Sequence, residues 1–281
     1  MKIYNAVTLA LIATVLASCA GAPDLQSRLE TAREQSGSKF QEITLETSQF
    51  DLFILATPVS ADGSLTVFIE GDGYAWQSRS RASNDPTPIT QTVLSLASAQ
   101  TSGNVAYLAR PCQFVGADSR NCHVSLWTGA RYSEPVVASL DEAISYLLSR
   151  QPTQTLRLIG YSGGGTLAAL LAARRTDVSS FVTIAAPLDI DAFTTHHKVT
   201  PLTASLNPRD YVNTLATIPQ VHIVGGQDTV TPKEIAFRYL DALPTQSCTQ
   251  MHVVPDATHW AGWQAMRPRA GNVVTECRNL Q

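Results

Sequence analysis

The fold is decided by the stretch LRLIGYSGGGTLAALLAA, residues 156–173. It begins with the apolar run 156–159, which is typical of a strand buried on both faces of a sheet. It ends in small apolar residues that favour a helix, and glycines surround Ser162 between the two. A direct turn from strand to helix forces unfavourable backbone angles, which the chain tolerates only where the neighbours lack bulk. We therefore expect the Ser162 hydroxyl to project at the carboxyl edge of a sheet.

Residues Gly160 to Gly164 match the pattern G-x-S-x-G of a nucleophile elbow. The N–H of Gly163 would lie at a helix N-terminus, where it can donate to an oxyanion. The competing interpretation is a glycine-rich turn that holds a phosphate. No Lys follows these glycines as a P-loop requires, and the sequence contains no G-x-G-x-x-G. The context therefore favours the elbow.

Outward from this stretch, the chain alternates strand-like and helix-like segments from about residue 45. An apolar stripe at 3.6-residue spacing over 136–148, after Ser133 and Pro135, predicts a helix. The sequence Thr-Pro-Lys-Glu at 231–234 predicts a capping box at the start of another. This alternation predicts an α/β fold in which helices flank a mostly parallel sheet. Short apolar runs predict its strands at 65–70, 105–109, 156–159, 181–184, 221–224 and 251–254.

Over roughly residues 48–265 the chain resembles the α/β-hydrolase superfamily, whose members order their catalytic residues as Ser, acid and His. Here a strand-like run and a glycine-rich turn lead to Asp228, and a later run and a short loop lead to His259. The resemblance implies a triad of Ser162, Asp228 and His259. His259 would take the proton of the Ser162 hydroxyl, a weak nucleophile on its own, and Asp228 would fix the imidazole tautomer. The alternative roles are a surface-loop histidine and a turn-forming aspartate.

A second oxyanion donor, beside Gly163, would come from the loop after the strand at 65–70. In many members of the superfamily this loop begins with His-Gly, whereas here Glu70 precedes the glycine. The matching donor is the backbone N–H of Asp72, and the alternative is that of Gly73. The Asp72 carboxylate would disfavour a developing negative charge unless it is paired or points away.

Aromatic side chains near these positions are candidates for contact with a substrate. They are Tyr74 and Trp76 on the oxyanion loop, Tyr161 in the elbow and Trp260 after the predicted catalytic His. Their alternative role is to cover the edge of the core. Residues 186–218 form a long, mixed, proline-containing stretch, in which we expect an insertion that acts as a lid or a pocket wall.

The N-terminus carries an export signal. Lys2 precedes an eleven-residue apolar run, which is shorter than the roughly 20 residues that span a bilayer and fits the core of a secretory signal peptide. The run ends in Leu-Ala-Ser-Cys19, which resembles the bacterial lipobox. The resemblance implies a lipoprotein signal peptide over 1–18 and lipidation of Cys19, for example with palmitate. Ala20, rather than Asp, then indicates a lipid anchor in the outer membrane, facing the periplasm.

These signals divide the chain into three parts. After the signal peptide, the polar residues 19–44 are expected to form a lipid-anchored tether with room for some helix, and residues 45–281 the α/β-hydrolase domain. Four cysteines remain in an exported domain, an even number that favours disulfides. Pairing Cys112 with Cys122 closes a short loop, and Cys248 with Cys277 would then hold the C-terminal tail; a metal site is the competing interpretation, although no Cys-x-x-Cys is present.

Composition narrows the function further. The 281 residues carry a formal net charge of -3 and no basic run, so we expect no nucleic-acid partner. Nothing in the sequence implies a cofactor. We expect a serine hydrolase of the cell envelope that cleaves a carboxylic ester of a small molecule or lipid through an acyl-enzyme. The alternatives are a peptidase or amidase on the same fold, and a non-catalytic lipid-anchored binding protein.

Overall fold

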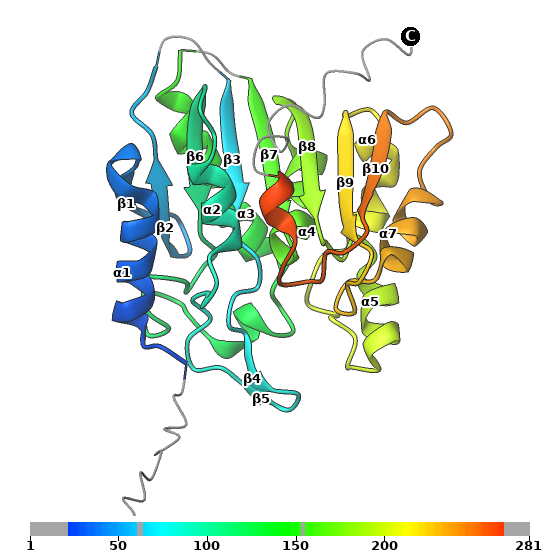
Figure 1. Ribbon diagram of the computed structural model, residues 1–281, viewed down its shortest axis with the longest axis horizontal. Coiled ribbons are helices and arrows are strands. Elements are labelled where there is room, and N and C mark those ends of the chain that lie inside the picture. The colour runs from blue at the N-terminus through cyan, green and yellow to red at the C-terminus, as the bar shows by residue number, and fades with distance from the viewer. Residues whose placement is uncertain (1–21, 61–63, 153–154, 267–281) are drawn as a thin grey trace, which may run out of the picture.

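The structure is a computed structural model that describes residues 22–60, 64–152 and 155–266. The strands of its central sheet are β1 (Gln41–Glu46), β2 (Asp51–Ala56), β3 (Leu65–Ile69), β6 (Asn104–Leu108), β7 (Leu156–Tyr161), β8 (Val178–Ile184), β9 (Gln220–Gly225) and β10 (Thr249–Val254). They lie in the order β1-β2-β6-β3-β7-β8-β9-β10 (Figure 1). The six strands from β6 to β10 pair in parallel, whereas β2 runs antiparallel to both β1 and β6. The predicted mostly parallel sheet is confirmed.

Helices cover both faces of this sheet (Figure 1). One face carries α1 (Leu25–Ser36), α2 (Thr92–Ser98) and the short helix η4 (Trp263–Met266), and the other carries α3 (Glu134–Ser149), α4 (Gly163–Arg174), α6 (Val212–Leu215) and α7 (Lys233–Leu240). A buried apolar cluster fills each of the two layers. The remaining elements are η1 (Gly37–Lys39), β4 (Trp76–Ser78), β5 (Arg81–Ala82), η2 (Val124–Trp127), α5 (Ile190–His197) and η3 (Pro208–Tyr211).

The helix α3 forms for the reasons that its sequence indicates. Ser133 is its N-cap residue, although its side chain makes no capping hydrogen bond, and Pro135 lies in the first turn, where a missing N–H costs no hydrogen bond. The apolar stripe over 136–148 is buried against the sheet, which stabilises an amphipathic helix more than its intrinsic propensity does.

The folded domain begins earlier than the predicted boundary at residue 45. Within the segment 19–44, predicted to be a tether, residues from Leu25 onward form α1 and most of β1. The buried Ala32 of α1 belongs to the apolar cluster with α2, and the guanidinium of Arg28 forms a buried ion pair with Asp85. The polar composition of this segment conceals the packing, because few of its side chains are apolar. Cys19 lies outside the described residues.

The segment 186–218 also differs in part from its prediction. It contains α5, η3 and α6, and it contributes Leu188, Ile190 and Leu215 to the buried cluster beneath α3 and α4. Much of this segment therefore extends the helix layer of the domain. Its role as a lid or pocket wall stays a prediction.

A disulfide joins Cys112 to Cys122, with their Cα atoms 5.7 Å apart. The second predicted pairing involves Cys277, which lies outside the described residues. Within residues 22–60, 64–152 and 155–266, no helix has both the length and the apolar character needed to cross a membrane.

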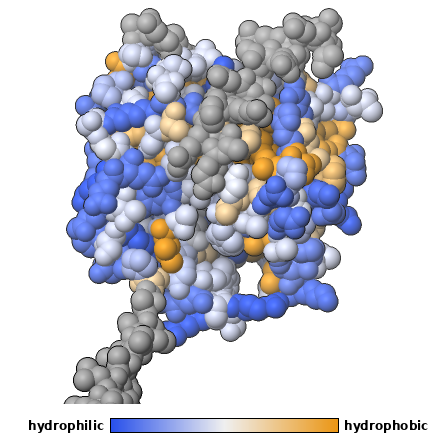
Figure 2. Space-filling model, viewed as in Figure 1, coloured by the Kyte–Doolittle hydropathy of each residue, from blue (hydrophilic) through white to orange (hydrophobic). Residues whose placement is uncertain are grey.

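The strand β10 closes one side of the sheet. It pairs with β9, and its residues are intermediate or exposed throughout, unlike the buried residues of β9. Hydrophobic side chains are visible on this side of the molecule in Figure 2, and Val253 of β10 is 44% exposed. The chain passes from β10 directly into the loop that carries His259.

Candidate active site

Ser162 lies in the turn between β7, in the middle of the sheet, and α4. Its φ of 52° is a left-handed conformation that non-glycine residues rarely adopt. Its own N–H donates to the carbonyl of Ile184 at 2.8 Å, which fixes the turn to the neighbouring strand. A Cβ on Gly160 would lie 2.1 Å from the backbone oxygen of Gly164, so strand and helix approach closely only with glycine there. The expected elbow geometry is therefore present.

The structure brings together the three residues of the predicted triad. His259 Nε2 lies 3.1 Å from Ser162 Oγ, and His259 Nδ1 lies 2.9 Å from Asp228 Oδ2. His259 is 2% exposed and Asp228 5%. A hydroxyl, an imidazole and a buried carboxylate thus stand in one hydrogen-bonded line, which is the geometry expected of a catalytic triad.

Thr231 is a member of this site that the sequence does not reveal. Asp228 Oδ1 accepts the N–H groups of Val230 and Thr231, both at 2.8 Å, and Thr231 Oγ1 lies 2.8 Å from Asp228 Oδ2. Burial raises the pKa of Asp228, but the hydrogen bonds from His259 and Thr231 outweigh it and lower the pKa overall. The carboxylate is therefore held ionised in one orientation.

The predicted capping box at 231–234 is wrong for the same reason. The N-cap residue of α7 is Pro232, which makes no side-chain cap, and the helix begins at Lys233. The Thr231 hydroxyl contacts Asp228 and the carbonyl of Ala185 instead of a helix N–H. The Thr231 side chain thus makes a tertiary contact with the buried Asp228 carboxylate instead of the local capping hydrogen bond that the sequence pattern predicts.

Two aromatic side chains hold the His259 loop. Both the Tyr161 hydroxyl and the Trp263 indole N–H donate to the carbonyl of His259, the latter at 3.0 Å. Tyr161, predicted to contact substrate, is only 6% exposed. Its position supports the loop of the base, which is a positioning role.

Of the N–H groups expected to bind an oxyanion, that of Gly163 directly follows Ser162, and those of Asp72 and Gly73 belong to a loop that passes close to Ser162 at Gly71. A Cβ on Gly71 would lie 3.4 Å from Ser162 Cβ, so the loop after β3 passes directly beside the hydroxyl. Gly163 is the first residue of α4. The N–H groups of Asp72 and Gly73 donate to no acceptor among the described residues. Both remain candidates for the second donor beside Gly163.

The Asp72 side chain is paired, as a carboxylate at this place must be. It forms ion pairs with Arg110 and with Arg131, the latter at 2.6 Å, and the Tyr132 hydroxyl donates to it at 3.3 Å. Burial raises the pKa of Asp72, but the charges of Arg131 and Arg110 bring it down to about 2. The cluster is therefore charged throughout the neutral range, and its net charge beside the nucleophile is positive.

Beneath the same loop lies Glu70, which is 2% exposed. It accepts the N–H of Gly71 and the hydroxyl of Tyr107, both at 2.8 Å. Burial raises the pKa of Glu70 to about 7, even though these hydrogen bonds and the charge of Arg110 lower it. The residue that departs from the superfamily pattern thus anchors the first peptide of the oxyanion loop.

The other predicted aromatic residues lie in different surroundings. Trp260 is 65% exposed, and its ring stands edge-on to that of His259, with centroids 4.7 Å apart. Tyr74 lies under the guanidinium of Arg28 from α1. Trp76 is 42% exposed on β4, part of a small hairpin at the lower edge in Figure 1. Of the three, Trp260 is the one whose ring contacts a residue of the predicted triad.

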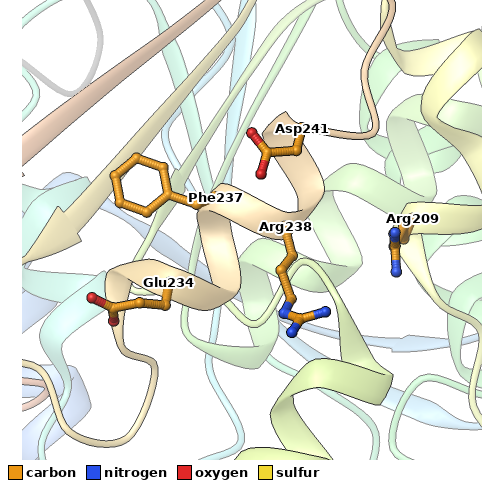
Figure 3. A pocket seen from close by; sticks show the side chains of 5 residues that line it. All are labelled: Arg209, Glu234, Phe237, Arg238 and Asp241. Carbon is orange, nitrogen blue, oxygen red and sulfur yellow. The ribbon is translucent and has the colours of Figure 1, made fainter.

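A cavity of about 370 Å³ lies elsewhere. In Figure 3 the side chains of Glu234, Phe237, Arg238 and Asp241 project from α7, and that of Arg209 comes from η3. None of them is a predicted site residue. The described residues also contain no group of three or more His, Cys, Asp and Glu side chains placed to hold a metal ion.

Known proteins resemble this chain in part of its sequence and in its fold. The family profile described as "Serine hydrolase (FSH1)" matches residues 116–262, more than half of the chain. No curated protein has a significant sequence match to this chain.

Among solved structures, the Pyrococcus furiosus esterase Pf2001 is 15% identical with a TM-score of 0.62, covering 85% of this chain and 90% of its own. Est1E from Butyrivibrio proteoclasticus is 12% identical with a TM-score of 0.58, covering 82% and 95%. The Pyrococcus horikoshii acylaminoacyl peptidase is 11% identical with a TM-score of 0.58, covering 83% of this chain and 39% of its own. These likenesses identify the fold as the predicted α/β-hydrolase fold.

Proposed function

The chain belongs to the serine hydrolase (FSH1) family, and from this premise we propose that it hydrolyses carboxylic esters through Ser162, His259 and Asp228. The observation that carries the proposal is the pair of contacts made by the His259 ring, 3.1 Å to Ser162 Oγ and 2.9 Å to Asp228 Oδ2. One side of the imidazole is thus placed to take a proton while the other side is fixed by a buried carboxylate.

The proposed reaction has two halves. Ser162 Oγ attacks the carbonyl carbon of the ester while its proton passes to His259 Nε2, and N–H groups of Gly163 and the loop after β3 stabilise the oxyanion. When the C–O bond of the ester breaks, His259 returns the proton to the leaving alcohol. A water molecule, deprotonated by His259, then attacks the acyl-enzyme and releases the acid and free Ser162.

We place this activity in the cell envelope, with a lipid anchor on Cys19. The apolar run before Cys19 and the lipobox-like Leu-Ala-Ser-Cys sequence support the anchor. The Cys112–Cys122 disulfide agrees with an oxidising compartment. In cells, Cys19→Ala should move the protein from the membrane fraction to the soluble fraction and abolish labelling with a palmitate analogue. Retention of either in the variant would contradict the anchor.

A fluorophosphonate probe tests the nucleophile. Wild type should be labelled and Ser162→Ala should not. The matched control is Ser125→Ala, because Ser125 Oγ also lies 3.1 Å from a histidine nitrogen, that of His123, but is not part of the triad. Equal labelling of Ser162→Ala and wild type would refute the proposal.

A substrate panel then decides which bond is cleaved. We expect turnover of p-nitrophenyl acyl esters to exceed that of amino-acid p-nitroanilides. Preference for the anilides would assign the protein as a peptidase or amidase, and labelling without turnover of either class would leave the ester proposal without support.

A further inference from the structure

A cavity of about 560 Å³ lies beside the base of the triad. Its walls include Gln35 of α1, Gln91 and Thr92 at the start of α2, and Trp260 and Trp263 from the segment after His259. In Figure 1 the helices α2 and η4 lie side by side on this face. The Trp260 ring contacts that of His259, with centroids 4.7 Å apart. The volume is within the range of about 300–1,000 Å³ that is usual for small-molecule sites.

The chemistry of the walls restricts the ligand. Six of the ten lining residues are Ser, Thr or Gln, two are Trp, and none of the ten is charged. Hydroxyl and amide groups both donate and accept hydrogen bonds, so they suit a ligand rich in hydroxyl groups. The absence of charge among these residues disfavours an ionic ligand, and the many polar groups disfavour a plain hydrocarbon chain. The exposed face of Trp260 suits the apolar face of a sugar ring.

Two polar atoms of the lining residues, Gln91 Oε1 and the Thr92 hydroxyl oxygen, have no hydrogen-bond partner among the described residues. Gln91 is 5% exposed, and its side-chain oxygen Oε1 is buried without a hydrogen bond, while its Nε2 donates to the carbonyl of Arg28. No hydrogen bond of the Thr92 hydroxyl to another described residue is present. The Thr92 hydroxyl is therefore available to a ligand, whereas Gln91 Oε1 is buried away from the open space of the cavity.

The position beside His259 indicates which part of an ester would enter. In the proposed reaction His259 Nε2 gives its proton to the leaving oxygen, so the leaving alcohol lies on the side of His259, whereas the carbonyl oxygen lies on the side of Gly163. We propose that this cavity binds a neutral carbohydrate as the alcohol part of the substrate, so that the enzyme removes acyl groups from sugar hydroxyls. This inference rests on the proposed ester hydrolysis: the ester C–O bond breaks, the acyl group passes to Ser162 Oγ, and the sugar oxygen takes the proton from His259.

Binding is tested first, without turnover. In the Ser162→Ala background, methyl 6-O-acetyl-α-D-glucopyranoside should bind saturably, as measured by calorimetry. Adding Trp260→Ala or Thr92→Val should weaken binding, by about tenfold for the loss of the aromatic anchor. The control is Phe237→Ala, which removes an aromatic side chain of 39% exposure from α7 and should leave binding unchanged. Failure to bind, or equal binding by the Trp260→Ala variant, would overturn the proposal whether or not the enzyme cleaves esters.

Kinetics then connects the cavity to the reaction. Ethyl acetate offers the same acyl group on a small primary alcohol, and hexyl acetate offers a hydrocarbon chain. Wild type should show a lower KM for the sugar ester than for ethyl acetate, and the ratio of the two kcat/KM values should fall about tenfold in Trp260→Ala and Thr92→Val but not in Phe237→Ala. A preference for hexyl acetate over the sugar ester would assign the cavity to an apolar chain and refute the inference. Sugar binding without hydrolysis of any ester would instead count against the proposed function alone.

Discussion

The carboxylate of Asp72 occupies the space into which a side chain at position 163 would project. A Cβ on Gly163 would lie 2.0 Å from Asp72 Oδ1 and 2.8 Å from Arg110 Nη1. The second glycine of the elbow is therefore matched to the ion-pair cluster on the oxyanion loop. Nucleophile turn and oxyanion loop fit together only while this position has no side chain.

Gly163→Ala should therefore lower kcat strongly in a protein that still folds. The added methyl group must displace Asp72 and with it the loop that supplies the second N–H donor, and the loss of such a donor costs roughly 10²–10³-fold in kcat. The assay is hydrolysis of a p-nitrophenyl ester under saturating conditions. Gly129→Ala is the control, since no heavy atom lies within 4 Å of its added Cβ. Equal kcat values for the two variants would contradict the steric argument.

Asp228→Asn should leave the fold intact and reduce kcat by roughly 10⁴-fold, because the amide no longer holds the required tautomer of His259. Asp256→Asn is the matched control, as Asp256 is an exposed carboxylate on the loop that carries His259. Steady-state kinetics of both variants, with circular dichroism to check folding, provides the measurement. A loss of less than tenfold in Asp228→Asn would remove this carboxylate from the mechanism.

The Asp72 cluster makes a prediction about stability. Asp72→Ala leaves the guanidinium groups of Arg110 and Arg131, with side chains 4% and 10% exposed, without their counter-charge, which should cost about 3–5 kcal/mol in the free energy of unfolding. The comparison is Glu134→Ala, which breaks the ion pair with Arg174 at a side chain 61% exposed and should cost at most about 1 kcal/mol. Urea unfolding monitored by fluorescence measures both. Similar losses would mean that the buried cluster contributes no more than a surface pair.

Glu70 should make stability depend on pH. Its pKa is raised from 4.5 to about 7 in the folded state, so folding favours the protonated form. The resulting stabilisation is complete below pH 4.5 and is lost as the pH rises through 7. Glu70→Gln imitates the protonated form, so the variant should gain roughly 2–3 kcal/mol relative to wild type between pH 5 and pH 8. Urea unfolding at the two pH values measures this difference, and an unchanged difference would contradict the raised pKa.

The fold could be predicted from the sequence where short apolar runs and amphipathic stripes are strong. All six runs proposed as strands correspond to β3, β6, β7, β8, β9 and β10. The six runs do not include β1 and β2. The strand β1 has no buried residue and so lacks an apolar run, whereas residues 52–55 of β2 are a buried apolar run that indicates a strand by the same criterion as the other six. The sequence allows some helix in the predicted tether, but it does not indicate that α1 packs on the domain, because the few buried residues of α1 include the charged Arg28, whose burial depends on a partner far along the chain.

The three residues of the proposed triad could be predicted because each has a recognisable place in the sequence, directly after a strand. Ser162, Asp228 and His259 each come after a strand, and parallel strands bring their carboxyl ends to one edge. The supporting residues were not predictable in the same way. Thr231 resembled a helix cap, Tyr161 resembled a pocket residue, and the pairing of Asp72 with two arginines depends on contacts over 38 and 59 positions of sequence. Such contacts have no local pattern.

The placement of β10 has a consequence for the working life of the enzyme. Ser162 follows β7, which pairs with β3 on one side and β8 on the other. His259 follows β10, which among the described strands pairs with β9 alone. Outer strands fray before central ones. On mild heating, β10 would unfold locally and move His259 away from Ser162. The rest of the sheet would stay folded, so the circular dichroism spectrum would remain native. Loss of activity would then occur at a lower temperature than global unfolding. Adding a segment that pairs with or covers β10 would therefore prolong activity more than improving the packing of the hydrophobic core.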